Sequence, residues 1–420
     1  MTTMTPNSPW GTAPLVEILL AETAIRIELP PSWHRLAVDR YEAVRKHVER
    51  EGSPLKDRVA LFYPQGSMAI GATIRSRRHA TDYDIDIVAE LLLTSDTSPS
   101  QVLDLLFEAI NGPPGSRYHG KVERQTRCVT VYYEDGMHLD VTPSILLDPS
   151  DPRISYIFHA NPDLSESTHR RLVMNSHGFA RWFNQRTPID IQFSEAYRDR
   201  ALAHERESGM VALAEADAEP VPDHSTQNGG KSTIVVGLQL LKRNRNILYS
   251  DNGSGRIPPS VFLSTMAGKM AAQRVSISQS LELISRHALG RLEAAQESNS
   301  LIRVVNPVCA KDVFTDRWPE DLPAQKRYID QLHHFRTQLH GLVNEGDLES
   351  KKKLLSGMFG EDLAESVIAR YAKDMGLAVR SGQRSVDTLG RIVPTTTALS
   401  SNSTGAGNPR KHTFYGGRLE

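Results

Sequence analysis

The stretch YDIDIVAEL, from Tyr83 to Leu91, alternates between apolar and acidic residues over its first half. Successive side chains of an extended chain point to opposite faces, so this pattern predicts a β-strand. Ile85 and Ile87 share a face suited to a hydrophobic core, while Asp84 and Asp86 share the opposite face. Carboxylates placed side by side repel each other, so the acidic face needs solvent or a cation beside it.

A second stretch, MHLDVT, from Met137 to Thr142, repeats the pattern. Leu139 and Val141 are apolar, and Asp140 lies between them on the opposite face. This stretch follows a predicted strand over Cys128–Tyr133 and an Asp-Gly turn, which together indicate a β-hairpin. If the two acidic strands are neighbours in a sheet, three carboxylates meet on one polar face.

Three carboxylates on one face suit hard divalent cations. Mg²⁺ prefers oxygen ligands, and one or two carboxylates commonly hold it together with substrate phosphates. Two such ions can stabilise the attacking and leaving oxygens of an in-line displacement. We therefore predict a metal site at Asp84, Asp86 and Asp140, with Mn²⁺ as a substitute for Mg²⁺. The alternatives are a strand edge that is merely solvated, and a register in which Asp82 pairs with Asp84.

A phosphate site is indicated shortly before the acidic strand. Gly66-Ser67 follows a predicted strand, Val59–Tyr63, and opens a short segment toward Thr73. Glycine allows backbone amides to approach an anion closely, and a helix N-terminus offers unpaired N–H groups. The hydroxyl of Ser67 adds a donor for a terminal phosphate.

The predicted elements place a mixed lobe first and a helical lobe second. Amphipathic patterns predict helices over Trp33–Arg50 and Gln101–Ile110. Beyond Asp148 the pattern is mostly helical, with predicted helices over Ser176–Gln185, Ser194–Glu207, Thr233–Leu248, Pro259–Met270, Ser276–Glu297, Ala324–Asn344 and Leu348–Met375. We expect an α+β fold with a core and its N-terminal helix at 1–190, a helical lobe at 191–380 and a flexible tail at 381–420. The tail is rich in Ser, Thr and Gly and lacks periodicity.

The composition favours a protein whose substrates are small. The chain has 420 residues and a formal net charge of −1. Binding long nucleic acid normally requires a basic excess, because phosphate neutralisation supplies most of the affinity, so we expect no such partner. Glu17 and Glu22 break the N-terminal apolar run, and no apolar run reaches the ~20 residues that span a bilayer. Cys128 and Cys309 lie outside any CxxC pair and indicate neither zinc nor a disulfide framework. We expect a cytoplasmic protein without membrane contact.

The run QGSMAIGATIRSRRHATDYDIDIVAEL, followed by HLDVTPSI, resembles the polymerase-β-like nucleotidyltransferases, in which Gly-Ser precedes an Asp-x-Asp pair and a third Asp. More narrowly, it resembles the cGAS/DncV-like nucleotidyltransferases of bacterial anti-phage (CBASS) signalling, which are relatives of the oligoadenylate synthetases. Later segments also resemble family elements, although Ser176 and Val313 replace the usual residues: NSHGFARWFNQRT, TIVVGLQLLKRNRNIL, IPPSVFLSTMAG and NPVCAKDVFTDRW. The ordered matches extend from about Gly66 to Trp318.

The resemblance implies a fold and a set of roles. The fold is a polymerase-β-like core, a mixed sheet with helices, joined to a C-terminal helical lobe of the oligoadenylate-synthetase type, with the active site in the cleft between them. Asp84 and Asp86 would bind two metal ions, while Asp140 would complete the catalytic metal site and help deprotonate the attacking ribose hydroxyl. The implied nucleotide-binding residues are Gln65, Gly66, Ser67, Lys242 and Ser260.

The function that the resemblance implies is synthesis of a cyclic di- or trinucleotide second messenger. The substrate would be ATP, alone or with a second NTP, and the product would act on a downstream effector in anti-phage defence. One rival hypothesis is a template-free nucleotidyltransferase that acts on RNA or on a small acceptor. Another is a catalytically silent nucleotide sensor.

The C-terminal tail suggests a further partner. Some members of the resembled family are conjugated through the C-terminus by a ubiquitin-activating-type ligase. The segment Phe414-Tyr415-Gly416-Gly417 would suit such a ligase, although the final Arg418-Leu419-Glu420 departs from a small-residue end.

Overall fold

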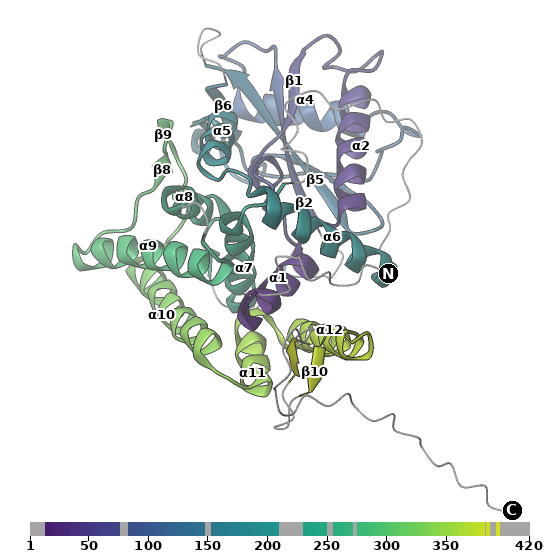
Figure 1. Cartoon of the computed structure of the whole chain (residues 1–420). Helices are drawn as coiled ribbons and strands as arrows, with labels where there is room; N and C mark the ends of the chain where they lie inside the picture. Colours follow the sequence, from purple (N-terminus) through teal and green to yellow (C-terminus); the bar gives the residue numbers. More distant parts are fainter. Residues whose placement is uncertain are drawn as a thin grey trace, which may run out of the picture.

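The computed structural model describes residues 13–75, 83–147, 153–209, 230–249, 255–271, 275–382, 384–386 and 392–394. These residues form a mixed sheet flanked by helices and, below it in Figure 1, a lobe built mainly of helices. The arrangement confirms the expected α+β class. Among the described helices, none is both long and apolar enough to cross a membrane.

The described part of the sheet has seven strands. They are β1 (Val59–Pro64), β2 (Tyr83–Leu91), β3 (Val122–Arg124), β4 (Val129–Tyr132), β5 (Met137–Leu146), β6 (Ser155–His159) and β7 (Arg170–Met174). Five of them follow the order β1-β2-β5-β4-β3, and β6 pairs with β5 and β7. The two acidic strands, β2 and β5, are parallel neighbours, which confirms the contact that alternation suggested.

One face of this sheet is covered by two helices. The helices are α2 (Pro31–Val48) and α4 (Pro99–Asn111), and both pack into the same hydrophobic core as the apolar face of β2 and β5. Ile85 and Leu139 are fully buried in that core. The apolar side chains of β2 and β5 are therefore buried within the sheet lobe, and the acidic side chains on the opposite face point toward the second lobe.

The helical lobe contains most of the predicted helices at nearly the predicted limits. They are α5 (Ser176–Arg186), α6 (Ile191–Ser208), α7 (Thr233–Leu248), α8 (Ser260–Met270), α9 (Ile277–Glu297), α10 (Leu322–Asn344), α11 (Leu348–Phe359) and α12 (Glu361–Arg380). The prediction of one helix over Leu348–Met375 was wrong, because Gly360 separates α11 from α12. Its φ of 106° lies in the left-handed region, which favours glycine and ends a helix.

The expectation of a mostly helical chain beyond Asp148 missed several strands. β6 and β7 complete the central sheet, and β8 (Val305–Asn306) pairs with β9 (Cys309–Val313). The tail is also not wholly irregular, because β10 (Arg384–Val386) pairs with β11 (Ile392–Pro394). These strands span two to five residues, too few for a period of two to stand out. The Phe-Tyr-Gly-Gly segment lies outside the described residues.

The helix α1 (Leu15–Ile27), which the sequence did not predict, belongs to the second lobe by its packing. It lies among α6, α7, α9 and α12, beneath the sheet in Figure 1. Its acidic residues are buried and paired. Glu17 accepts hydrogen bonds from the backbone N–H groups of Ile277 and Ser278 at the start of α9, and Glu22 pairs with Arg26 and Arg200. The domain limit at residue 190 stays a prediction, but α1 and Phe179 of α5 pack in the helical-lobe core.

Candidate functional site

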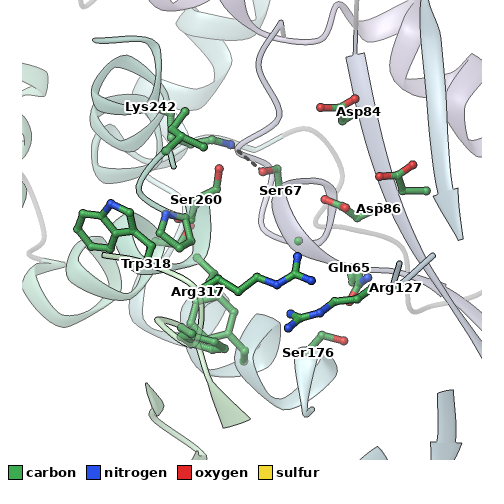
Figure 2. Close-up of a pocket in the computed structure, with 18 of the residues that line it drawn as sticks. Gln65, Ser67, Asp84, Asp86, Arg127, Ser176, Lys242, Ser260, Arg317 and Trp318 are labelled. Carbon is green, nitrogen blue, oxygen red and sulfur yellow. Dashed lines mark hydrogen bonds between the residues drawn. The ribbon is translucent and has the colours of Figure 1, made fainter. Parts of the chain in front are cut away.

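A pocket of about 860 Å³ lies between the acidic face of the sheet and the helical lobe. All eight residues predicted to form the site line it. They are Gln65, Gly66, Ser67, Asp84, Asp86, Asp140, Lys242 and Ser260. Figure 2 shows Asp84 and Asp86 on one side of the pocket and Lys242 and Ser260 on the other. The pocket thus has a strand wall and a helical wall.

The strand wall is set by the register of β2 against β5. Asp86 lies directly opposite Asp140, and Asp84 lies opposite His138. Asp140 is oriented from its other side by β4, where the Oγ1 of Thr130 donates a hydrogen bond of 2.6 Å to Asp140 Oδ1. Asp84 is the most exposed of the three, and its Oδ1 lies 4.0 Å from His138 Nδ1. Asp82 lies outside the described residues, so the alternative register stays a prediction.

The carboxylates on this wall repel each other. Burial, followed by the charges of Asp140 and Asp84, raises the pKa of Asp86 to about 7, and the charge of Lys242 acts in the opposite direction. Like charges held close together in a partly desolvated site favour protonation or the arrival of a cation. The wall therefore has the electrostatic property expected of a cation site.

The Gly-Ser turn closes over the strand wall. Gln65 donates its backbone N–H to the carbonyl of Asp86 at 2.8 Å, and α3 (Gly66–Ala69) begins at the next residue. Gly66 has a φ of 57°, and a Cβ built there would stand 2.4 Å from Asp86 Oδ2. The position favours glycine, because a side chain there would need a left-handed backbone conformation and would displace the Asp86 carboxylate.

Lys242 connects the helical wall to the Gly-Ser turn. Its Nζ donates to Ser67 Oγ at 2.7 Å, the contact drawn as a dashed line in Figure 2, and to the carbonyl of Ala72 at 2.7 Å. Burial, followed by the charge of Arg245, lowers the pKa of Lys242 to about 7, while the charge of Asp86 opposes that shift. An anion beside Lys242 would stabilise the ammonium form. The lysine and the serine predicted to bind phosphate are therefore brought together.

The loop after the Gly-Ser turn is held by the helical lobe at three consecutive carbonyls. Lys231 Nζ donates to the carbonyl of Gly71 at 2.7 Å, Lys242 to that of Ala72, and Gln239 Nε2 to that of Thr73 at 3.2 Å. Three side chains from one lobe thus fix the backbone that carries Ser67 in the other lobe.

Ser260 lines the pocket at the start of α8. Its Oγ accepts a hydrogen bond of 3.1 Å from Arg245 Nη1, and that guanidinium also donates to the carbonyl of Pro258 at 2.8 Å. The hydroxyl hydrogen of Ser260 can therefore still serve a ligand, with the Oγ oriented by Arg245.

Sequence reasoning missed a group of charged residues on the same pocket. Arg127, Arg256, Asp316 and Arg317 line it. Asp316 and Arg317 lie in the segment NPVCAKDVFTDRW, but the resemblance of that segment implied no role for them, and Arg127 and Arg256 lie outside the quoted motifs. Two belong to loops that the fold brings together from opposite lobes, since Arg127 lies between β3 and β4, and Arg317 between β9 and α10. The available signals were the family-like segment that contains Arg317 and the basic character of these loops, which is also typical of solvated surface.

Asp312 on β9 lines the pocket and has a structural role. It accepts hydrogen bonds from the backbone N–H of Asn175 at 3.0 Å and from Asn306 Nδ2 at 2.9 Å. Burial raises the pKa of Asp312, whereas these two hydrogen bonds lower it. This buried network fixes the start of α5, and so places Ser176 on the pocket wall.

The strand wall fits divalent metal ions that act together with a phosphate ligand. Among the described residues, no group of three or more His, Cys, Asp or Glu side chains forms a ready-made metal centre. Asp84, Asp86 and Asp140 nevertheless share one wall of one pocket, and burial, followed by the charges of Asp140 and Asp84, raises the pKa of Asp86. Mg²⁺ usually keeps waters and substrate phosphates in its coordination shell, so an incomplete protein cage suits it.

Comparisons with known proteins agree with this geometry. A family model described as the Second Messenger Oligonucleotide or Dinucleotide Synthetase domain matches residues 24–155. The cyclic dinucleotide synthase CdnG of Bradyrhizobium diazoefficiens is 40% identical over 418 residues, which cover 98% of this chain and 97% of the relative. A c-di-GMP synthase of Roseivirga ehrenbergii is 26% identical over 351 residues, covering 83% of this chain and 85% of the relative.

A solved structure extends the match to three dimensions. The structure of the Bradyrhizobium diazoefficiens CD-NTase CdnG in complex with GTP superimposes with a TM-score of 0.73. The match covers 86% of this chain and 99% of that one, at 40% identity. Identity of this extent over nearly the whole length confirms the resemblance carried by the Gly-Ser and Asp-x-Asp motifs. The chain belongs to the cGAS/DncV-like nucleotidyltransferase (CD-NTase) family and is a nucleotidyltransferase.

Proposed function

We propose that this nucleotidyltransferase joins two nucleoside triphosphates into a cyclic dinucleotide second messenger. The observation that carries the proposal is the pocket itself, in which three carboxylates of the strand wall lie near the pair formed by Lys242 of the helical wall and Ser67 of the Gly-Ser turn. Carboxylates suit metal ions, and a lysine beside a serine suits a triphosphate. Together the two walls provide what transfer of a nucleotidyl group requires.

The residues of the pocket have separate roles in the proposed reaction. Ser67 and Lys242 bind the triphosphate of the donor nucleotide and orient its α-phosphorus toward the strand wall. Asp140, whose Oδ1 is held by Thr130, accepts the proton of the attacking ribose hydroxyl through its other oxygen. Asp84, Asp86 and Asp140 would hold two Mg²⁺ ions, which when bound stabilise the negative charge that develops on the attacking and leaving oxygens.

The relatives guide the choice of substrates. One relative has been solved with GTP, and another is a c-di-GMP synthase. We propose GTP as one substrate of this chain, and ATP, which the motif resemblance implied, as the candidate for the second position. A cyclic trinucleotide, the other product implied by the motifs, is less favoured, because both curated relatives make dinucleotides by name.

The proposal is tested by incubating the protein with single and paired radiolabelled NTPs and Mg²⁺ or Mn²⁺. Phosphatase treatment and mass spectrometry then identify the product, because a cyclic dinucleotide has no terminal phosphate to remove. We expect a phosphatase-resistant dinucleotide that contains guanosine. Wild-type protein that makes no more product than an Asp84→Ala/Asp86→Ala variant, in every NTP combination, would contradict the proposal and favour a silent nucleotide sensor.

The other rival, a nucleotidyltransferase acting on RNA or on a small acceptor, has a distinct outcome in the same experiment. It would leave the NTPs unjoined until an acceptor was added, and the labelled product would then contain that acceptor.

We further propose that the product acts in anti-phage defence through a downstream effector, as the family relationship suggests. Conjugation of the tail by a ubiquitin-activating-type ligase is a separate proposal. It predicts that removal of residues 411–420 leaves nucleotide synthesis in vitro unchanged while preventing attachment to a target. Loss of synthesis on truncation would instead show that the tail is needed by the folded enzyme.

A further inference from the structure

A second cationic group lies on the pocket, formed by Arg127 and Arg317. Arg127 belongs to the sheet lobe and Arg317 to the helical lobe. Figure 2 shows the two guanidinium groups side by side in the pocket, apart from the contact between Lys242 and Ser67. Their proximity follows from a shared partner, because His159 Nδ1 lies 2.8 Å from Arg317 Nη2 and 3.4 Å from Arg127 Nε.

The two guanidinium groups are held in fixed orientations. Arg127 Nη2 donates to Asp316 Oδ2 at 2.6 Å, and His159 Nδ1 accepts from both arginines. Burial, followed by the charges of Arg317 and Arg127, lowers the pKa of His159, so the imidazole stays neutral and able to accept. Fixing a guanidinium in advance reduces the entropy lost when it binds a ligand.

Positive charge exceeds negative charge around this pair. Arg256 also lines the pocket, but it pairs with Glu320 at 3.2 Å. Within the described residues, Asp316 is then the one acidic side chain that forms an ion pair with Arg127 or Arg317. A partly buried excess of positive charge that faces a pocket favours an anionic ligand.

We propose that Arg127 and Arg317 bind the 5′-triphosphate of the acceptor nucleotide, while Lys242 and Ser67 bind that of the donor. This inference rests on the proposed function, in which two NTPs must occupy the pocket together. Each NTP carries a polyphosphate, and the Lys242–Ser67 contact provides for only one of them. Paired guanidinium groups match the geometry of phosphate oxygens, since each can donate two parallel hydrogen bonds.

Under this proposal, the arginine pair contributes to only one of the two bond-forming steps. In the first step the acceptor's ribose oxygen attacks the α-phosphorus of the donor, the bond to the β-phosphate breaks, and pyrophosphate leaves. The hydroxyl proton passes to Asp140 and then to solvent. The linear dinucleotide retains the triphosphate of the former acceptor.

In the second step that triphosphate becomes the donor, so it must lie at Lys242 and Ser67. The attacking hydroxyl now belongs to the nucleotide that has already lost its pyrophosphate. No triphosphate remains for Arg127 and Arg317 to bind. The pair should therefore serve formation of the first bond and contribute little to ring closure.

The test compares an Arg127→Gln/Arg317→Gln variant with wild type and with Arg291→Gln, which changes an exposed arginine on α9. One assay starts from NTPs, and the other from the linear dinucleotide that corresponds to the wild-type product. We expect kcat/KM for the first bond to fall roughly 10–100-fold, because charge-assisted hydrogen bonds are lost. Closure of the supplied linear dinucleotide should stay within about threefold of wild type, as should both steps in Arg291→Gln.

Two results would overturn the proposal. Equal losses in both steps would show that the arginines contact a base, which the acceptor subsite needs in both steps, or that they only support the fold. An unchanged first step would show that they bind no substrate. Wild-type protein that is inactive in both assays would instead count against the proposed function.

A binding measurement keeps the test independent of turnover and of folding. Calorimetry with a non-hydrolysable NTP and Mg²⁺ should give two ligands per wild-type chain. Arg317→Lys, which retains the charge but loses the planar fork, should bind the second ligand at least several-fold more weakly, with an unchanged melting temperature. A second-ligand affinity unchanged from wild type in this variant would contradict the assignment.

Discussion

The two walls of the pocket are built in different ways. The strand wall takes its three carboxylates from β2 and β5, two neighbouring strands whose register places Asp86 opposite Asp140. The helical wall collects its cations from places far apart in the chain, such as Lys242 on α7 and Arg317 before α10. The carboxylates of the strand wall repel each other, and so do the cationic side chains of the helical wall. A metal ion and a polyphosphate are the ligands that relieve both at once.

The largest effect should come from removing a carboxylate of the strand wall. Asp86→Asn should lower dinucleotide synthesis by about 10³-fold or more, because metal ions contribute several kcal/mol to stabilising the transition state. Product formation under saturating Mg²⁺ measures this, and Asp330→Asn, an exposed aspartate on α10, is the matched control. A residual rate within tenfold of wild type would show that Asp86 is not a metal ligand.

The next largest effect should come from the helical wall. Lys242→Met should weaken binding of a non-hydrolysable NTP by about 10²-fold, because a charged donor to phosphate is lost. Binding of Mn²⁺ in the absence of nucleotide, followed by electron paramagnetic resonance, should persist in this variant. If Lys242→Met abolished metal binding as well, the two walls would not be separate sites.

A smaller effect is expected from the residue that orients Asp140. Thr130 is buried, and its hydroxyl donates to Asp140 Oδ1 at 2.6 Å. Thr130→Val keeps the shape and removes the donor, so Mn²⁺ affinity should fall about 10–100-fold, as for other residues that orient metal ligands. Thr130→Ser should restore most of the affinity. Equal affinity in the valine and serine variants would exclude an orienting role for the hydroxyl.

The smallest expected effect is a shift in the pH dependence of metal binding, which should depend on charges from both walls. The pKa of Asp86 is raised to about 7, so below that pH the carboxyl binds a proton that a metal must displace. Mn²⁺ affinity should therefore fall about tenfold per unit as the pH drops below 7, and level off above it. Lys242→Met removes a charge that lowers this pKa, so the fall should begin at a higher pH. A midpoint that does not move would show that the walls are electrostatically independent.

The sequence was informative for the strand wall, because a period of two reports directly on which side chains share a face. Asp84, Asp86 and Asp140 followed from alternation alone, and the parallel pairing of β2 and β5 confirms their common face. Lys242 and Ser260 required a family resemblance, since a helix periodicity does not show which distant element a residue meets. Arg127 and Arg317 followed from neither, because two loops of opposite lobes bring them together.

The same contrast holds for the fold: elements defined by their own sequence pattern were predicted, and an element that depends on distant partners was not. Long amphipathic helices such as α7 and α10 were predicted within a few residues. Helix α1 was not, because it is apolar on most sides and its charged residues are used internally, with Glu17 at the start of α9 and Glu22 on Arg26 and Arg200. Buried charges of this kind resemble surface residues until their partners are known.

The position of α1 also determines when the enzyme can finish folding. Arg26 Nε donates to Ser366 Oγ of α12 at 2.9 Å, a contact between residues 340 positions apart. At ~5–20 residues per second, a ribosome needs roughly 20–70 s to make that interval. The sheet-lobe core is formed by residues between 29 and 160, so it can form early. Helix α1 packs against α12, so it cannot dock fully until α12 has been synthesised. We expect ribosome-bound chains that end before α12 to carry a folded sheet lobe and an undocked α1.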